Sequence, residues 1–251
     1  MAKMVAPASA PLSERHRDAL HTLVADLTSV FGSRLRSVVA YRQDHRTTSD
    51  ERARALAVVE HLTTDDLRQL VPKARDWIKR GLGVPLILTH HEFVRTLDVF
   101  PLEYGEIIAS HVVIAGVNPF AGVHVADVDR RRACEHAAKS HLIHLREGYL
   151  ETLGEPSRIV SLIADSVPAF RSVIAHIVRL ERGVDVPAVS TDDHALAAEV
   201  QNIIGVPASL VDEVLGSMRG ATTIADPSVL LTRYIDAVTG IWRFVDRWKV
   251  D

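Results

Sequence analysis

The sequence of 251 residues has one cysteine, Cys134, and aromatic residues make up only 5% of it. A single cysteine excludes an intramolecular disulfide and any zinc site built from several cysteines. No apolar run reaches the roughly 18 residues that a membrane-spanning helix needs. Residues 1–12 also lack the continuous apolar core of a signal peptide, so we expect a flexible tail there and a cytoplasmic protein.

Charge of either sign is not in large excess, since the net charge is -3. This balance predicts no general affinity for nucleic acid or for an anionic membrane. With 47% hydrophobic and 24% charged residues, the composition is that of a globular chain. Its length fits one large domain or two small ones.

The first half of the chain alternates between helical and extended patterns. Apolar residues from Leu20 to Phe31 recur at helical spacing, with Ser13 as the expected N-cap, and a second helix is expected from the capping sequence at Thr64. Apolar runs bounded by turn residues predict strands at 35–42, 55–62, 85–89, 97–104 and 111–116.

The second half is helical in pattern throughout. Gly- and Pro-containing breaks separate five predicted helices, at about 127–152, 156–182, 191–204, 207–219 and 226–248. We therefore predict an α+β protein in which an N-terminal mixed sheet with helices, residues 13–123, precedes an all-helical bundle, residues 124–251.

The helix followed by strands at 35–42 and 55–62 resembles the start of the nucleotidyltransferase superfamily, which has the polymerase-β-like fold. A bacterial subgroup with an all-helical tail shares the later pattern as well. In that family the first strand ends in a Gly-Ser turn, and the next strand opens with Asp-x-Asp, which holds divalent metal. Here the corresponding positions are Arg42-Gln43 and Ala55-Leu56-Ala57.

The resemblance therefore implies a scaffold without its chemistry. Two-metal phosphoryl transfer needs clustered carboxylates, and an alanine methyl group supplies no ligand, so neither a metal nor another cofactor is expected. Arg42 would either bind a phosphate as a fixed cation or fill the empty site. The family's third carboxylate would fall on the strand at 98–103, where Asp98 or Glu103 would be its remnant.

Two further carboxylates, Asp44 and Asp50, lie in the polar segment between the first two strands. They would form a displaced metal pair if the loop held them in place. A solvated loop is the favoured interpretation, because a flexible segment does not preorganise carboxylates for a metal.

The predicted helix at 127–152 carries two features of interest. Cys134, His141 and His144 share roughly one face, which fits either a metal site or, as we favour, interhelical packing. Arg130 and Arg131 belong to a run of three arginines that opposes the helix dipole, so they are candidate ligands for phosphate as well as ordinary solvated side chains.

The helical half also resembles the HEPN class, some members of which are ribonucleases marked by an arginine followed four to six residues later by histidine. Arg131 with His136 and Arg171 with His176 match this spacing. With 13 histidines in a chain rich in arginine, chance matches are expected, and the motif is no evidence for a ribonuclease.

The leading hypothesis is a catalytically degenerate nucleotidyltransferase-like protein that acts as a binding or regulatory module for a nucleotide or a protein partner. The alternatives are an active nucleotidyltransferase with a rearranged metal site and a HEPN-like ribonuclease or toxin–antitoxin component. The aromatic-rich final helix, with Trp242 and Trp248, predicts a core seam of the bundle or an interface between copies of the chain.

Overall fold

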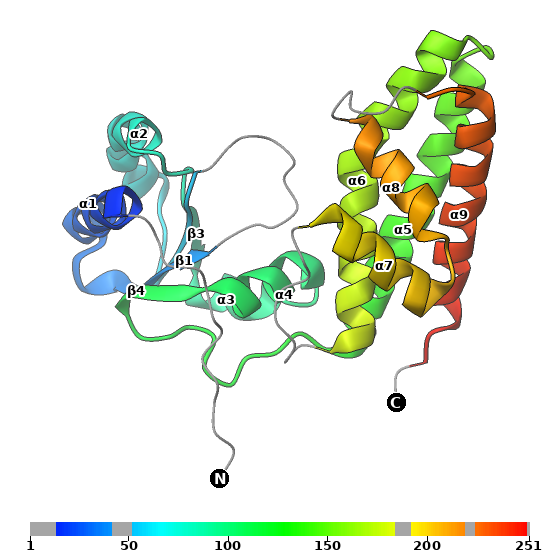
Figure 1. The fold of residues 1–251 in the computed structure, drawn as a ribbon. Coiled ribbons are helices and arrows are strands. Elements are labelled where there is room, and N and C mark those ends of the chain that lie inside the picture. The colour runs from blue at the N-terminus through cyan, green and yellow to red at the C-terminus, as the bar shows by residue number, and fades with distance from the viewer. Residues whose placement is uncertain (1–13, 42–51, 184–191, 219–223, 250–251) are drawn as a thin grey trace. The chain divides into compact units, whose positions relative to one another are not determined.

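The computed structural model describes residues 14–41, 52–183, 192–218 and 224–249. The chain forms two compact units, residues 1–126 and 127–251 (Figure 1). The first contains a four-stranded mixed sheet with helices, and the described residues of the second contain helices without a strand. The predicted α+β class is therefore confirmed. The expected tail and the expected N-cap Ser13 lie outside the described residues.

The sheet of the first unit has the strand order β3-β2-β1-β4. The predicted pair of strands is present, because β1 (Leu35–Tyr41) lies antiparallel to β2 (Arg54–Val59). A crossover through α2 (Thr64–Lys79) brings β3 (Leu86–Thr89) parallel to β2. The other edge is β4 (Val112–Gly116), antiparallel to β1.

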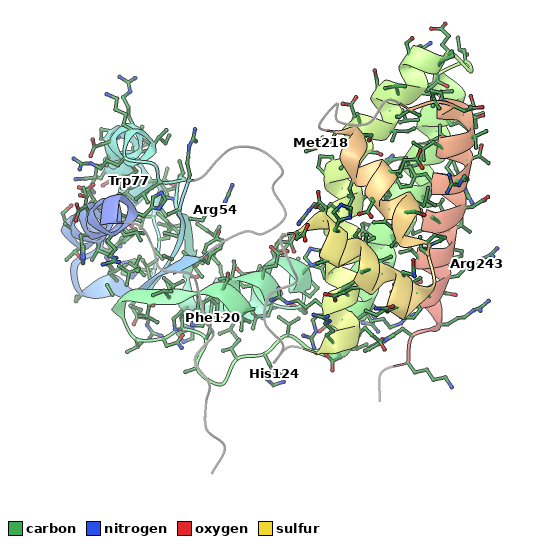
Figure 2. The ribbon with its side chains drawn as sticks, in the orientation of Figure 1. Arg54, Trp77, Phe120, His124, Met218 and Arg243 are labelled. Atoms are coloured by element: carbon green, nitrogen blue, oxygen red, sulfur yellow. The ribbon has the colours of Figure 1, made fainter. Side chains whose placement is uncertain are left out.

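Helices cover both faces of this sheet (Figure 1). The α1/α2 layer consists of α1 (Glu14–Phe31) and α2, and the α3/α4 layer consists of α3 (His90–Thr96) and α4 (Pro101–Ser110). The period of two along each strand sends alternate side chains to the two layers. Figure 2 shows Trp77 in the α1/α2 layer and Phe120 on the opposite side of the sheet.

The two helices of the α1/α2 layer are joined by polar contacts as well as by apolar packing. Asp26 of α1 accepts hydrogen bonds from Lys73 Nζ at 2.7 Å and from the Trp77 indole N–H at 2.8 Å. The start of α2 is fixed by a capping box between Thr63 and Asp66, one residue earlier than the predicted start. Arg34 pairs with both carboxylate oxygens of Asp66, which holds the pKa of this buried group far below its usual range.

The predicted strand at 97–104 is wrong, because this segment contains the turn after α3 and the first part of α4. Pro101 stands at the start of α4, where its fixed φ suits a helix and its missing N–H costs no hydrogen bond. Tyr104 and Ile107, three residues apart, are buried on one helical face. An apolar run of this length fits a strand or a buried helix equally well, and tertiary packing selects the helix.

The second unit consists of five helices over its described residues: α5 (Asp127–Glu151), α6 (Pro156–Arg182), α7 (Asp193–Ile204), α8 (Ala208–Ser217) and α9 (Pro227–Arg247). They start and end within two residues of the predicted positions. Among the described helices, α6 alone is long and apolar enough by composition to cross a membrane. Its apolar side chains pack against α5, α8 and α9 within the unit, which accounts for this composition.

The core of the helical unit contains one buried polar network. His141 of α5 shares a hydrogen bond of 2.7 Å between its Nε2 and the Tyr234 hydroxyl, to which Ser166 Oγ donates at 3.2 Å. Phe170 stacks on His141 and meets Tyr234 edge-on. This network ties together α5, α6 and α9. Of the aromatic residues of α9, Tyr234 lies in the core, whereas Trp242 and Trp248 are only half-buried.

Gly116, at the end of β4, is expected to tolerate no side chain. Its φ is +77°, and a Cβ would overlap the carbonyl oxygen of Arg36 on β1. Gly116→Ala should therefore cost at least about 2 kcal/mol of unfolding free energy, from the left-handed backbone and from the displaced strand. Gly122→Ala is the matched control, because Gly122 has a φ of +73° and no atom near its Cβ position. Urea denaturation of both variants measures the difference, and equal losses would contradict the proposed overlap.

Candidate functional site

The positions predicted to replace the metal-binding aspartates are buried in the core of the N-terminal unit. Ala55 and Ala57 are 2% and 0% exposed and belong to the apolar cluster of the α1/α2 layer. The alternate residues of β2, Leu56 and Val58, belong to the cluster on the opposite face, and by the same alternation Arg54 points to that side. The side chains of β2 that leave the α1/α2 core are Arg54, Leu56 and Val58.

The face to which these residues point is filled by the protein's own side chains. Phe93 of α3 packs edge-on against Tyr104 of α4 and against Phe120, with ring centroids 5.9 and 5.4 Å apart. We call these three residues the aromatic cluster; Leu56 and Val58 are buried with it. Burial raises the pKa of Tyr104 to about 12, so its phenol stays neutral. Apolar packing occupies this face of the sheet beside β2.

No local sequence pattern predicts this cluster, because its members lie in three separate segments of the chain. The signal that existed was the helical spacing of Tyr104 and Ile107, which the strand prediction overrode. The same misassignment hid Glu106, a carboxylate of α4 that is 5% exposed.

The two carboxylates predicted as a metal-binding remnant lie on no strand. Asp98 is exposed in the turn between α3 and α4, and Glu103 is exposed in the first turn of α4. The strand beside β2 is β3, whose four residues carry no carboxylate. The first carboxylate after β3 is Glu92, which accepts hydrogen bonds at 2.8 Å from the Thr89 backbone and hydroxyl in a capping box. These bonds lower its pKa.

Four other candidates, Arg42, Gln43, Asp44 and Asp50, lie outside the described residues. Within the described ranges, no three His, Cys, Asp or Glu side chains gather closely enough to hold a metal ion. A displaced metal pair at Asp44 and Asp50 therefore stays a hypothesis.

The arginines at the start of α5 have separate roles. Arg131 donates from Nε to the Trp248 carbonyl at 3.1 Å and from Nη2 to the Asp246 carbonyl at 3.0 Å, so it caps the end of α9. Arg132 is largely exposed, 3.9 Å from Asp129. Arg130 is only 6% exposed and pairs with Asp127. Acidic residues in the first turn offset the unfavourable dipole interaction that the sequence indicated.

The proposed cysteine–histidine face of α5 separates into core and surface. Cys134 is 1% exposed and His141 is 7% exposed, whereas the His144 side chain is 75% exposed and contacts Glu147. Burial raises the pKa of the Cys134 thiol to about 12, so the thiol stays protonated near neutral pH. The packing interpretation therefore fits Cys134 and His141.

The arginines of the two Arg–His matches have structural partners. Arg131 caps α9 as described, and Arg171, 6% exposed, donates from Nε to Asp193 Oδ1 at 2.9 Å. Asp193 opens α7, so this ion pair joins α6 to α7. Both contacts account for the arginines without a catalytic role.

Comparisons with known proteins give likenesses among solved structures only. No family model matches the chain, and no curated protein matches it. Among solved structures, the chain is similar to the spectinomycin adenyltransferase AAD(9) from Enterococcus faecialis with ATP and spectinomycin, at 12% sequence identity and a TM-score of 0.49. The likeness covers 92% of this chain and 99% of that one. It transfers neither an activity nor a ligand, because one fold hosts many functions.

Proposed function

We propose that this chain is a nucleotidyltransferase-like protein that has lost metal-dependent catalysis and acts as a binding or regulatory module. The observation that carries the proposal is the face of β2 away from α1 and α2. Arg54, Leu56 and Val58 occupy it, and the latter two pack with the aromatic cluster. A strand that presents a cation and two buried aliphatic side chains offers no oxygen ligand to Mg²⁺.

The order of elements supports the family part of the proposal. A helix precedes an antiparallel strand pair, a crossover helix leads to a strand parallel to the second, and a helical unit follows. The resemblance of the sequence to the nucleotidyltransferase superfamily implies this same order of elements. The degenerate part rests on chemistry, because phosphoryl transfer by that route needs carboxylates that hold two metal ions in line with the phosphate.

Any surviving ligand function is proposed to use positively charged side chains in place of metal. In the N-terminal unit, Arg42 stands where the family has the glycine of its phosphate-binding turn, and Gln43, Asp98 and Glu103 stay candidates for polar contacts. In the helical unit, Arg130 and Arg131 are separate candidates, although Arg131 already donates to the carbonyls at the end of α9. Guanidinium groups bind phosphate oxygens through charge-assisted hydrogen bonds. A nucleotide or a protein partner fits this description. Separately, the exposed part of α9 is a candidate interface between two copies of the chain.

The test is nucleotide binding with and without divalent metal. We expect ATP to raise the thermal unfolding temperature, because a ligand at about 100 times its dissociation constant adds about 2.7 kcal/mol of stability. The rise should be the same in 5 mM Mg²⁺ as in EDTA, because the proposed site binds phosphate through side chains and not through a metal ion. Calorimetry with Mg²⁺ alone should give no heat of binding in the micromolar range. A shift that requires Mg²⁺, or release of pyrophosphate from ATP, would favour the active nucleotidyltransferase alternative.

Arg42→Ala gives the matched variant for this experiment. If Arg42 binds phosphate, the variant should lose the nucleotide-dependent shift, by about 1.5–3 kcal/mol for one charge-assisted hydrogen bond. If Arg42 fills the site as a plug, the variant should lose stability without ligand and keep its response. Equal behaviour of variant and parent in both measurements would remove Arg42 from the proposed site.

A further inference from the structure

Arg130 is a buried cation whose hydrogen-bonding capacity is only partly used. Its side chain is 7% exposed, and its Nη2 pairs with Asp127 one turn earlier in α5. Among the described residues, none accepts a hydrogen bond from its Nε or its Nη1. These two nitrogens carry three of the five N–H donors of a guanidinium group. More than half of the donors of this buried charge therefore lack a protein partner in the described part of the chain.

The surroundings of Arg130 disfavour its charge. Burial is the main cause that lowers the pKa of its guanidinium, and Arg179, in the last turn of α6, contributes in the same direction. Asp127 is half exposed and supplies the one carboxylate in direct contact. A buried charged donor without an acceptor costs more free energy than a neutral one, because it has lost its hydration. Packing alone gives no reason for an arginine here, since an aliphatic side chain would fill the space without this cost.

We propose that Arg130, in the first turn of α5, is the main ligand of an oxyanion-binding site in the helical unit, and that this site binds a phosphoryl group. A phosphoryl group offers three terminal oxygens to the three N–H donors and up to two negative charges to the buried guanidinium of Arg130. A carboxylate offers two oxygens and one charge, so it satisfies the site less completely. The inference deepens the binding role proposed above, on which it rests, by naming the chemistry of a ligand for the helical unit.

The test uses inorganic phosphate and the full chain. Thermal unfolding is followed at pH 7.5 over increasing phosphate, with sodium chloride adjusted to keep the ionic strength constant. The unfolding temperature of the parent protein should rise with the logarithm of the phosphate concentration above the dissociation constant. In Arg130→Met this rise should be lost. The same variant should unfold at an equal or higher temperature than the parent without phosphate, because an unsatisfied buried cation has been replaced by an apolar side chain of similar length.

Arg132→Met is the matched control. Arg132 lies two residues away in the same helix, its side chain is 71% exposed, and its replacement removes the same charge. This variant should keep the full phosphate response. An equal loss in both variants would indicate a general effect of charge and overturn the site.

A second measurement on the parent protein avoids dependence on the folding of a variant. Phosphate should slow amide hydrogen exchange in residues 127–134 and 176–182, the segments around Arg130 and Arg179. No phosphate response in either measurement would overturn the proposal. Buried water would then be the partner expected for the Nε and Nη1 donors of Arg130. Because neither nucleotide nor Mg²⁺ is present, such a failure would not touch the nucleotide test of the proposed function.

Discussion

Placing an aspartate at Ala57 is expected to unfold the N-terminal unit instead of creating a metal site. Ala57 is 0% exposed and lies among apolar residues of the α1/α2 layer, including Leu23 and Leu27 of α1. A carboxylate there would be desolvated without a partner, which costs about 3–5 kcal/mol when a buried charge is left uncompensated. This cost is comparable with the whole stability of a small domain. Urea denaturation followed by circular dichroism measures the loss.

Arg54→Asp is the control for this experiment. Arg54 is half-buried on the same strand, and its side chain points away from the α1/α2 layer. A carboxylate at this position reaches solvent, so the loss should stay within about 1 kcal/mol. If Ala57→Asp were as stable as the parent and bound Mg²⁺ in calorimetry, the assignment of the two faces of β2 would be wrong.

The helical unit is expected to lose stability as the pH falls from about 6.5 to about 4. Burial lowers the pKa of His141 to about 4, with a smaller contribution from His144. An unfolded histidine has a pKa near 6.5. Between these values the unfolded chain binds a proton that the folded chain does not, so acid favours unfolding. A shift of this size is worth roughly 3 kcal/mol, because one pKa unit corresponds to about 1.4 kcal/mol.

His141→Gln isolates this effect. Glutamine keeps a polar group near the Tyr234 hydroxyl and does not titrate, so the variant should show a nearly flat stability between pH 6.5 and 4.5. His144→Gln is the control, because the His144 side chain is 75% exposed on the same helix and its loss should leave the slope almost unchanged. Asp26 and Asp66, whose pKa values are lowered in the folded chain, contribute only at lower pH. A parent protein with no slope in this window would contradict the buried, neutral state of His141.

The candidate site shows where sequence reasoning reached its limit. That the two alanines of β2 supply no metal ligand follows from side-chain chemistry alone. Which face of the strand they occupy could not be predicted, because a fully apolar strand between two helical layers has no alternation of polar and apolar residues. A related ambiguity affects residues 97–104, because a short apolar run fits a strand or a buried helix equally well. The strand prediction there placed Asp98 and Glu103 on a strand that the fold does not contain.

Arg130 illustrates a second limit. The sequence shows three consecutive arginines at the start of a helix, and local rules treat them alike. The fold assigns Arg131 to the carbonyls at the end of α9, leaves Arg132 in solvent and buries Arg130. These fates depend on which distant elements pack against the first turn of α5, and sequence spacing within one helix carries no information about them.

The sequence by itself determined the α+β class, the strands β1 and β2, and the positions of α5 to α9 within two residues. Local signals suffice for these features: hydrophobic period, capping residues and Gly or Pro breaks act over a few residues. That β1 and β2 run antiparallel was decided by the tertiary structure. Tertiary structure alone decided that Ala55 and Ala57 face α1 and α2, that the aromatic cluster covers the other side of β2, and that Arg130 is buried. Each of these is a contact between elements far apart in the chain, where packing and desolvation outweigh local preference.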